Sequence, residues 1–216
     1  MDRQSRSRIR RKKRRRDRLI ALAARHADWL VGFADETWWS REARPALHAW
    51  TATGQPLRLV EVTVPAADPA PKALACYGVW LPECDATWLR FVDGRPVSEV
   101  TMQFLAWCAQ RAAALGKTTL VLIWDRAGWH LSRRLWAWLR QHNQAVQRTG
   151  GGVRIIPCLL PTQSPWLNPI EPKWIHGKRR IIEPDRLLSL EELEDRVCDA
   201  FACPRYQHLA FPKNVC

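Results

Sequence analysis

Three carboxylates stand at positions where catalytic groups commonly lie. Asp35 follows the apolar run WLVGFA, Asp125 follows the apolar run TTLVLIW, and Glu171 lies in the segment SPWLNPIEPKW. A carboxylate at the end of a buried strand loses hydration energy unless it is paired, hydrogen-bonded or bound to a metal. Because no cation inside the motifs is matched to these carboxylates, we expect hard divalent ions, Mg²⁺ or Mn²⁺, as their partners. Paired ions of this type promote in-line phosphoryl transfer, so the pattern predicts phosphodiester chemistry.

Glu171 also has a purely structural interpretation. Asn168 suits the N-cap of a helix, Pro169 suits the first helical position, and Glu171 follows Asn168 by three residues, where it can close a capping box. Pro172 removes an early helical N–H donor, which favours a later helix start and leaves the Glu171 carboxylate free. The segment alone favours the cap, and the two strand-end aspartates favour metal binding.

Apolar runs and turn residues predict the elements that position these side chains. In the predicted α/β sheet, ligand sites form beyond the carboxyl ends of strands, where Asp35 and Asp125 are expected. A meander of strands followed by alternating helices and strands predicts a mixed sheet with helices on both faces. Strands are expected at 29–34, 57–64, 74–81, 87–92, 118–124 and 153–160, and helices at 98–115, after Ser132, from the Glu171 segment to about 180, and from Ser189 to about 201.

Most of the positive charge lies at the start of the chain. Residues 1–18 hold eleven Arg or Lys against two Asp and account for +9 of the total net charge of +13. Like charges repel and this run has no evident apolar face, so we expect a disordered tail at 1–18 and a short helix at 19–28. The tail is either a solvated leader or, as we favour, a polyanion-binding arm. Its expected contacts are Arg8, Arg10, Arg11, Lys12, Lys13, Arg14, Arg15 and Arg16.

Length and composition exclude several classes of protein. The 216 residues, 47% of them hydrophobic, suffice for one domain with a full core. No apolar stretch reaches the length of a membrane span, so a soluble intracellular protein is expected. The seven cysteines are odd in number and none has C-x-x-C spacing, which favours reduced core thiols over disulfides or a zinc site.

The three motifs together resemble those of a known enzyme family. FADETWWS, VLIWDRAGWH and LPTQSPWLNPIEPKW are similar to the catalytic blocks of DDE-type insertion-sequence transposases of the mariner superfamily, over about residues 29–181. The resemblance implies a ribonuclease H-like fold in which Asp35, Asp125 and Glu171 are the catalytic residues and bind two Mg²⁺ or Mn²⁺ ions. In the second block His130 matches the family pattern, whereas Arg126 replaces the usual asparagine.

The resemblance also implies an activity and partners. We expect a catalytic domain at 29–201, followed by a C-terminal tail at 202–216, that cleaves DNA and transfers strands at transposon ends. The expected partner is double-stranded DNA, as transposon ends and as target, bound by a homodimer in the bacterial cytoplasm at the nucleoid. Family members carry helix-turn-helix modules ahead of this domain. Because only the Arg-rich segment stands there, we expect a separate recognition polypeptide, a split element or a truncated remnant.

Other residues are weaker candidates. His130 is expected to orient Asp125 or contact DNA, with a satisfied structural histidine equally plausible, and Asn168 is expected to support the site or contact DNA. Glu36 neighbours Asp35, but successive strand residues point to opposite faces, so Glu36 is expected to be structural or to support the site indirectly. Trp38 and Trp39 are expected on the sheet face or in the core. The cations that either bind phosphate or form a solvated face are Lys173, Lys178, Arg179 and Arg180.

Two alternatives remain open at this stage. Another nuclease on the same fold would share the metal site but would not join strands. A non-catalytic nucleic-acid-binding remnant or transposition inhibitor would use the basic segment and keep the carboxylates for structure. Metal-dependent nicking separates the second alternative from both enzymes.

Overall fold

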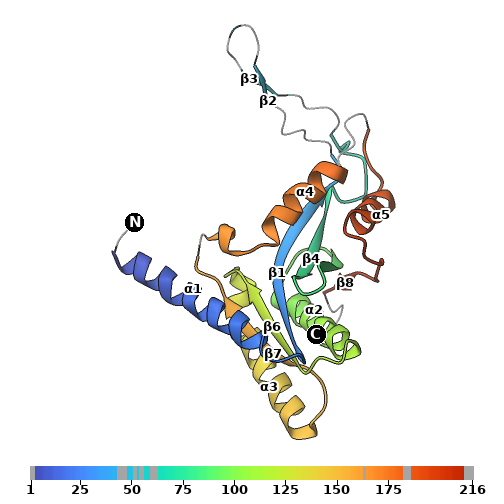
Figure 1. The fold of residues 1–216 in the computed structure, drawn as a ribbon. Helices are drawn as coiled ribbons and strands as arrows, with labels where there is room; N and C mark the ends of the chain where they lie inside the picture. The colour runs from blue at the N-terminus through green and yellow to red at the C-terminus, as the bar shows by residue number, and fades with distance from the viewer. Residues whose placement is uncertain are drawn as a thin grey trace.

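A mixed six-stranded sheet forms the centre of the protein (Figure 1). The computed structural model describes residues 3–42, 48–50, 53, 56–58, 63–162, 164–181 and 186–211. The strand order is β7-β6-β1-β4-β5-β8, and the strands are β1 Trp29–Ser40, β4 Ala73–Leu81, β5 Ala86–Asp93, β6 Thr119–Trp124, β7 Arg154–Leu159 and β8 Leu209–Ala210. Strands β1, β4 and β5 form an antiparallel meander of three strands instead of the predicted four, and β6 and β7 run parallel to β1.

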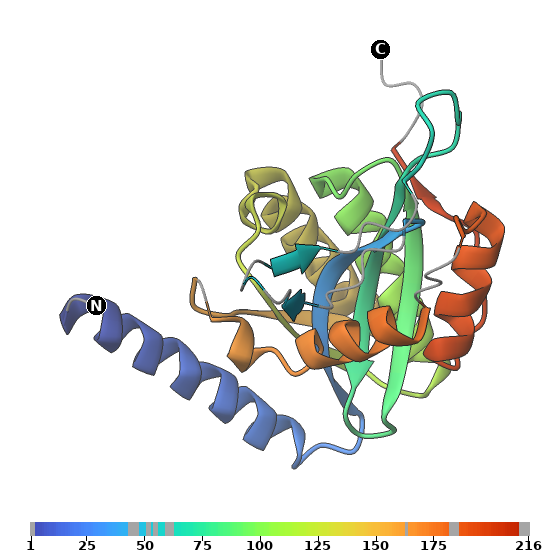
Figure 2. The same cartoon turned by 90° about the horizontal axis from the view of Figure 1, so that it is seen from above.

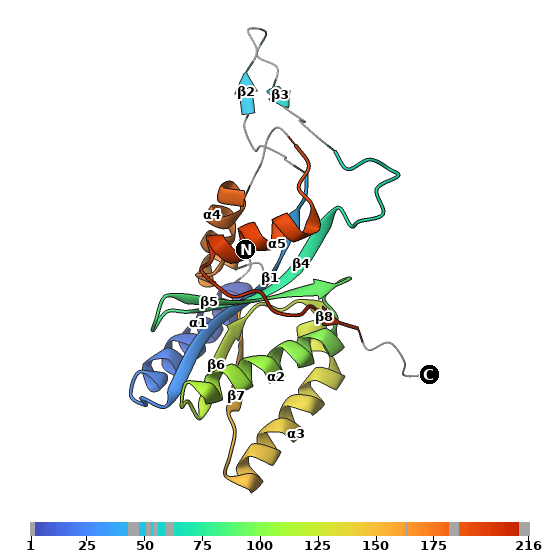
Figure 3. The ribbon, with the colours of Figure 1, turned by 90° about the vertical axis from the view of Figure 1, so that its right-hand side faces the viewer.

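Helices cover both faces of this sheet, as expected for a ribonuclease H-like fold. Figure 3 shows α2 (Ser98–Ala114) and α3 (Arg133–Thr149) on one side, and α4 (Glu171–Ile181) and α5 (Leu190–Ala200) on the other. Two of the predicted caps are present. The Ser132 hydroxyl accepts a hydrogen bond from the Leu135 N–H at the start of α3, and the Ser189 hydroxyl accepts one from the Glu192 N–H at the start of α5.

The side chains of β1 alternate between two apolar cores. Leu30 and Ala34 join the cluster under α2 and α3, whereas Phe33 and Trp39 join the cluster under α4 and α5. The period of two residues in a strand requires this alternation. It also determines which face of the sheet each polar residue of β1 can reach.

Strand β1 is longer than its apolar run predicts. It was expected to end at Asp35, but it continues to Ser40 and pairs with β4 over this whole extension, up to Ser40 opposite Ala73. Asp35 therefore lies inside a strand. The backbone of β4 supplies hydrogen-bond partners to the polar residues as readily as to the apolar ones, so the change of side-chain character does not end the strand.

The segment between β1 and β4 contains a small antiparallel pair, β2 (His48–Trp50) and β3 (Pro56–Arg58). The pair is drawn at the top of Figure 1, apart from the main sheet. The strand predicted at 57–64 overlaps β3 at its start, residues 59–62 lie outside the described residues, and Val64 lies in a loop.

The basic N-terminal segment is a helix, contrary to the prediction. Helix α1 spans Arg3–Ala23, so the expected disordered tail and short second helix are replaced by a single element. Leu19, Ile20 and Ala23 pack into the core cluster that α4 and α5 cover. Further toward the N-terminus, the guanidinium groups of Arg16 and Arg15 donate to the Leu167 and Pro157 carbonyls, which the charge count does not reveal. Figure 2 shows α1 running along one flank of the sheet.

The C-terminal segment also differs from the expected tail. Leu209 and Ala210 form β8, which pairs in parallel with β5. His208 lies between Asp93 on β5 and Glu194 on α5, at 2.9 Å from the Glu194 carboxylate. The described part of this segment is thus a component of the sheet.

Two predictions from composition can be compared with the structure. No helix in the described part of the chain combines the length and apolar character needed to cross a bilayer. The six described cysteines, at positions 76, 84, 108, 158, 198 and 203, are free thiols, as predicted.

Candidate active site

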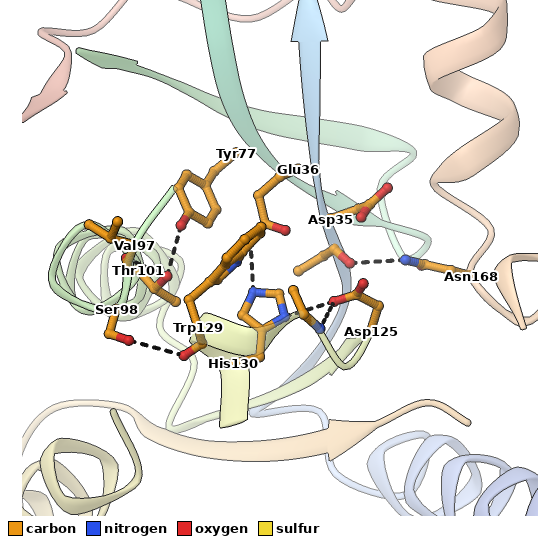
Figure 4. A network of polar contacts seen from close by, with 12 residues as sticks. Asp35, Glu36, Tyr77, Val97, Ser98, Thr101, Asp125, Trp129, His130 and Asn168 are labelled. Atoms are coloured by element: carbon orange, nitrogen blue, oxygen red, sulfur yellow. Dashed lines mark hydrogen bonds and ion pairs between the residues drawn. The ribbon is translucent and has the colours of Figure 1, made fainter. Parts of the chain in front are cut away.

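Asp35 and Asp125 lie side by side on neighbouring parallel strands. The pairing of β1 with β6 runs to Phe33 opposite Ile123, and the same offset places Asp125, the residue after β6, level with Asp35. On both strands the odd-numbered residues, such as Phe33 and Ile123, point to the face that carries α4, and Asp35 and Asp125 follow the same alternation. Figure 4 shows Asp35 and Asp125 on adjacent segments, with Asn168 approaching from the other side.

The third motif is attached to β1 through Asn168. The Asn168 side-chain NH₂ donates a hydrogen bond to the Ala34 carbonyl at 3.0 Å, and Asn168 is 2% exposed. The capping box considered for Asn168 and Glu171 does not form, because the Asn168 side-chain oxygen accepts no hydrogen bond among the described residues and the Asn168 backbone N–H donates to the Pro165 carbonyl. Asn168 therefore joins the turn before α4 to the residue that precedes Asp35.

Glu171 begins α4 and faces the same region as the two aspartates. Its backbone N–H donates to the Asn168 carbonyl at 3.2 Å, so the attachment of Asn168 also positions Glu171. A cavity of about 160 Å³ is lined by Asp125, Asn168 and Glu171. Glu171 and Asp125 therefore line the same cavity.

Trp174, on helix α4, forms a hydrogen bond with the Asp35 carboxylate. The indole Nε1–H of Trp174 donates to Asp35 Oδ2 at 2.9 Å. The ring can approach because residue 78 of β4, opposite Asp35, is glycine, and a Cβ there would lie 2.2 Å from the indole. Trp174 is not among the site residues predicted from the sequence. Its spacing of three residues from Glu171, on the same face of a helix, is the signal that could have found it.

The electrostatics of this face favour a bound cation. Burial, then the neighbouring carboxylates of Glu171 and Glu36, raise the pKa of Asp35 to about 7. Burial and the charge of Asp125 likewise raise the pKa of Glu171 above its ordinary value. Like charges at close range destabilise one another, and a divalent cation between them would remove the repulsion.

The donor set of this face fits a hard divalent ion. Carboxylate oxygens are the ligands that Mg²⁺ and Mn²⁺ prefer. The side-chain oxygen of Asn168 is a buried acceptor that has no hydrogen-bond partner among the described residues. Asp125, Glu171 and Asn168 line the cavity, and the Asp35 carboxylate lies close enough to Glu171 to be destabilised by its charge, so this face is rich in oxygen ligands of the expected chemistry.

His130 bridges two carboxylates on the opposite side of Asp125. Its Nδ1 lies 2.8 Å from Asp125 Oδ1, its Nε2 lies 2.8 Å from Glu36 Oε1, and the ring is 1% exposed and stacks on Trp124. Burial opposes its protonation, but Glu36 and Asp125 together raise the pKa of His130 to about 9. Both ring nitrogens are then donors. The imidazolium donates a hydrogen bond to Asp125, the contact that the predicted orienting role requires.

The same network explains the position of Glu36. Its side chain points away from Asp35, as predicted, and also accepts a hydrogen bond from Trp129 Nε1 at 3.3 Å. Glu36, Asp125 and His130 lie close enough together to suggest a metal site. However, both His130 nitrogens already contact carboxylates at hydrogen-bond distance, so the geometry is that of an imidazolium between two carboxylates.

The pKa of Asp125 reflects its two neighbours. Burial acts to raise it, but the hydrogen bonds from His130 and from the Ala127 N–H at 3.0 Å outweigh burial and hold the pKa below its ordinary value. Asp125 therefore stays ionised when Asp35 does not. Arg126, which stands where the related family has asparagine, lines the same cavity as Asp125 and Glu171.

The predicted cations around α4 are only partly available. Lys173 forms an ion pair with Asp85 at 2.8 Å and lies over the Trp80 ring, and Arg180 donates to the Ala200 carbonyl. Arg179 is exposed, and so is Lys178, whose ammonium group lies 5.9 Å from the centre of the Trp39 ring.

The two tryptophans after Asp35 behave differently from each other. Trp39 is 1% exposed and packs edge-on against Trp174, as expected of a core residue. Trp38 is 47% exposed on the opposite face of β1. Among the described residues, neither Trp38 nor Trp39 forms a hydrogen bond to a site carboxylate. The indole N–H donors to Asp35 and Glu36 are those of Trp174 and Trp129.

The fold and the arrangement of carboxylates define the class of protein. Residues 31–194 match the family described as DDE superfamily endonuclease, which is most of the chain. The chain belongs to this family. A comparison with curated proteins found no match.

Among solved structures, the chain is similar to the Mos1 mariner transposase. A paired-end complex with the left transposon end matches with a TM-score of 0.60 and 15% identity, over 95% of this chain and 56% of the Mos1 chain. A paired-end complex with Mn matches with a TM-score of 0.60 and 15% identity, over 94% and 56%. The isolated catalytic domain matches with a TM-score of 0.56 and 15% identity, over 95% and 84%. The chain thus spans little more than half of the full transposase.

Proposed function

We propose that this chain is the catalytic domain of a DDE-type transposase of an insertion sequence, which cleaves DNA at transposon ends and transfers the cut strand to a target. Asp35, Asp125 and Glu171 are its catalytic residues and hold two Mg²⁺ or Mn²⁺ ions. The observation that carries the proposal is the meeting of these carboxylates on one face, with the pKa of Asp35 raised to about 7. Such crowding is costly unless a cation is bound.

The chain's own residues prepare the site in three ways. Asn168 and Trp174 fix the positions of Glu171 and Asp35, through the Ala34 carbonyl and the Asp35 carboxylate. His130 orients Asp125 and keeps it ionised. The bound ions would activate a water or 3′ hydroxyl for in-line attack on the phosphodiester and stabilise the leaving oxygen.

Arg126 is a further candidate for contact with substrate. It lines the cavity beside Asp125 and Glu171, and among the described residues no carboxylate forms an ion pair with it. A guanidinium matches the geometry of a phosphate with two parallel hydrogen bonds. Arg126 would hold the phosphate at which the water or 3′ hydroxyl attacks. The exposed Lys178 and Arg179 would contact the flanking backbone.

Double-stranded DNA is the proposed substrate, both as transposon end and as target. The structurally similar Mos1 proteins were solved with a transposon end and as a strand transfer complex. The basic segment around Arg8 to Arg16 supplies the matching positive charge. From the resemblance to insertion-sequence transposases, we further propose that the chain acts as a homodimer in the bacterial cytoplasm at the nucleoid, with a separate polypeptide for sequence recognition.

Nicking of DNA by the Asp125→Asn variant tests the proposal. Purified protein is incubated with supercoiled plasmid and Mg²⁺ or Mn²⁺, and we expect nicking by the unaltered chain and none by the variant. Asp199→Asn, an exposed substitution of the same charge on α5, is the matched control and should nick normally. Unchanged nicking by Asp125→Asn would overturn the assignment of the site. Joining of a pre-cut end with a free 3′ hydroxyl to a target duplex separates a transposase from a nuclease.

Absence of nicking under every metal condition would favour a non-catalytic DNA-binding remnant. Loss of nicking in a variant identifies a site residue only if the variant folds. Circular dichroism of Asp125→Asn and Asp199→Asn should match that of the unaltered chain, because neither substitution changes the volume of a core residue.

A further inference from the structure

Helix α1 presents two different faces. Arg16, Leu19, Ile20 and Ala23 lie on the face that packs on the body of the protein. Arg11, Arg14 and Arg18 follow one another at spacings of three and four residues and are all exposed, so they form a stripe along a single helical face. At 100° per residue this arginine stripe lies opposite the packed face.

The packed face joins α1 to the segment that carries Glu171. The Arg16 guanidinium donates to the Leu167 carbonyl at 2.9 Å, and its side chain is 15% exposed and paired with Asp17. The Arg15 guanidinium donates to the Pro157 carbonyl of β7 at 3.3 Å. Leu167 immediately precedes Asn168, which is attached to the residue before Asp35. Through these contacts α1 has a defined position relative to the carboxylates.

We propose that α1 is a DNA-docking helix whose arginine stripe binds the phosphate backbone of the duplex and sets its position relative to the active site. The inference rests on the proposed DNA substrate and adds the surface and the manner of binding. Arg11 and Arg18 are about 10 Å apart along the helix axis, which corresponds to roughly three nucleotide steps along one strand of duplex DNA. A rigid row of this length follows neighbouring phosphates without the entropy loss of ordering a flexible tail.

The helix is oriented to direct DNA toward the site. Its C-terminus connects to the start of β1, so its N-terminal half extends in the opposite direction, toward the side of the sheet on which β1, β6 and β7 end. The Arg16 contact lies beside the turn Pro165–Leu167, which leads directly into Asn168 and Glu171. A duplex held by the stripe therefore approaches the cavity from the flank that α1 occupies.

The test compares a pair of exposed cations on α1 with a pair on α3. Arg11→Gln/Arg18→Gln removes two members of the stripe, whereas Arg140→Gln/Arg148→Gln removes two exposed cations of α3 and gives the same net charge. Glutamine preserves the helix, since its helix propensity is close to that of arginine and lysine. Binding to a fluorescent duplex is titrated without metal at several salt concentrations, so that the result does not depend on cleavage.

The slope of log K against log salt is negative, and we expect the stripe variant to make it shallower by roughly 2, because about 0.9 is lost for each phosphate contact. The control variant should keep a slope close to that of the unaltered chain. Hydroxyl-radical footprints should show a protected patch on one strand that the stripe variant alone loses. Equal slopes for the two variants would show that the stripe contributes no more to DNA binding than the cations of α3, and would overturn the proposal.

A second arm of the experiment tests the partner. Binding of the unaltered chain to phosphatidylglycerol vesicles in preference to the duplex would identify a membrane surface as the partner and would also overturn the proposal. Nicking assays run in parallel separate the two hypotheses. If the unaltered chain nicks DNA while both variants bind alike, the docking helix is wrong and the catalytic proposal stands.

Discussion

Asp35 and Glu36 are neighbours on β1, yet the protein treats them differently. The Glu36 carboxylate meets a cation, the imidazolium of His130, and also the Trp129 indole N–H. The Asp35 carboxylate meets one neutral donor, Trp174, and the negative charge of Glu171. One face of the strand is neutralised inside the protein, and the other is left with excess negative charge.

This difference separates a structural carboxylate from a metal-binding one. A paired carboxylate contributes to folding and has little affinity left for an external cation. A carboxylate close to other carboxylates destabilises the metal-free protein, and binding of a divalent ion there stabilises the folded state. Asp125 belongs to both networks, because His130 contacts one oxygen while the residue also lines the cavity with Glu171.

The largest expected effect comes from replacing each of the two neighbouring carboxylates by its amide. Asp35→Asn should lower the nicking rate by about 1000-fold or more, since several kcal/mol of charge stabilisation by the ions would be lost. Single-turnover nicking rates at saturating Mg²⁺ measure the effect. Glu36→Gln should cost only about 10-fold, as expected for a residue that acts by orienting a ligand. An equal loss in both variants would identify Glu36 as the ligand and reverse the comparison.

Arg126 should have the next largest effect. Arg126→Ala is expected to lower the nicking rate by about 100-fold if the guanidinium stabilises the charge of the reacting phosphate, the usual range for one such donor. Arg126→Lys should recover only part of the rate, because lysine cannot form two parallel hydrogen bonds. A faster reaction or tighter Mg²⁺ binding in Arg126→Ala would show instead that Arg126 competes with the ions for the carboxylates.

Removal of metal should reverse the effect of Asp35 on stability. In chelator, Asp35→Asn should be more stable to urea than the unaltered chain by about 1 kcal/mol, because a buried charge crowded by Glu171 is removed. Mg²⁺ at 100 times its dissociation constant should stabilise the unaltered chain by about 2.7 kcal/mol and the variant by far less. A lack of stabilisation of the unaltered chain by Mg²⁺ or Mn²⁺ would contradict a metal site on this face.

The smallest effect concerns a histidine network far from the site. His208 lies between Asp93 and Glu194; burial opposes its protonation, but hydrogen bonds to the two carboxylates outweigh burial and raise its pKa. Its stabilisation should be complete below the ordinary histidine pKa of about 6.5 and should be lost as the pH rises through the raised folded-state value. His208→Gln should therefore cost about 1–2 kcal/mol at pH 6, and less at pH 9.

Urea unfolding at the two pH values measures this effect, and nicking at neutral pH is the control. The variant should nick DNA at the normal rate, because this network does not contact the cavity residues. A loss of stability that does not change with pH would show that His208 acts through packing alone.

Much of the site could be predicted from local sequence. The carboxylates at 35, 125 and 171 stand out because each follows an apolar run or lies among prolines, and strand periodicity correctly placed Glu36 on the face opposite Asp35. The strands β4, β5, β6 and β7 and the Ser132 and Ser189 caps follow from patterns a few residues long. These features depend on neighbours in the chain, which the sequence displays directly.

The predictions that failed concern contacts between distant segments. The charge of residues 1–18 predicts a disordered tail, but α1 forms because Leu19, Ile20 and Ala23 pack on the core and Arg16 finds a carbonyl 151 residues away. Strand β1 continues past Asp35 because β4 is there to pair with it. Local repulsion and local polarity were outweighed by partners that a single window of sequence does not contain.

The sequence by itself indicated the three candidate carboxylates, the alternation of helices and strands from β4 to α5, and the face of β1 on which each acidic residue lies, because propensity and periodicity act over a few residues. The tertiary structure alone decided that Asn168 would attach to Ala34 rather than cap α4. It also decided that Gly78 would admit the Trp174 ring beneath Asp35, and that His130 would neutralise Glu36. Burial and partnership set the charge of a carboxylate, and both depend on segments that meet only when the chain folds.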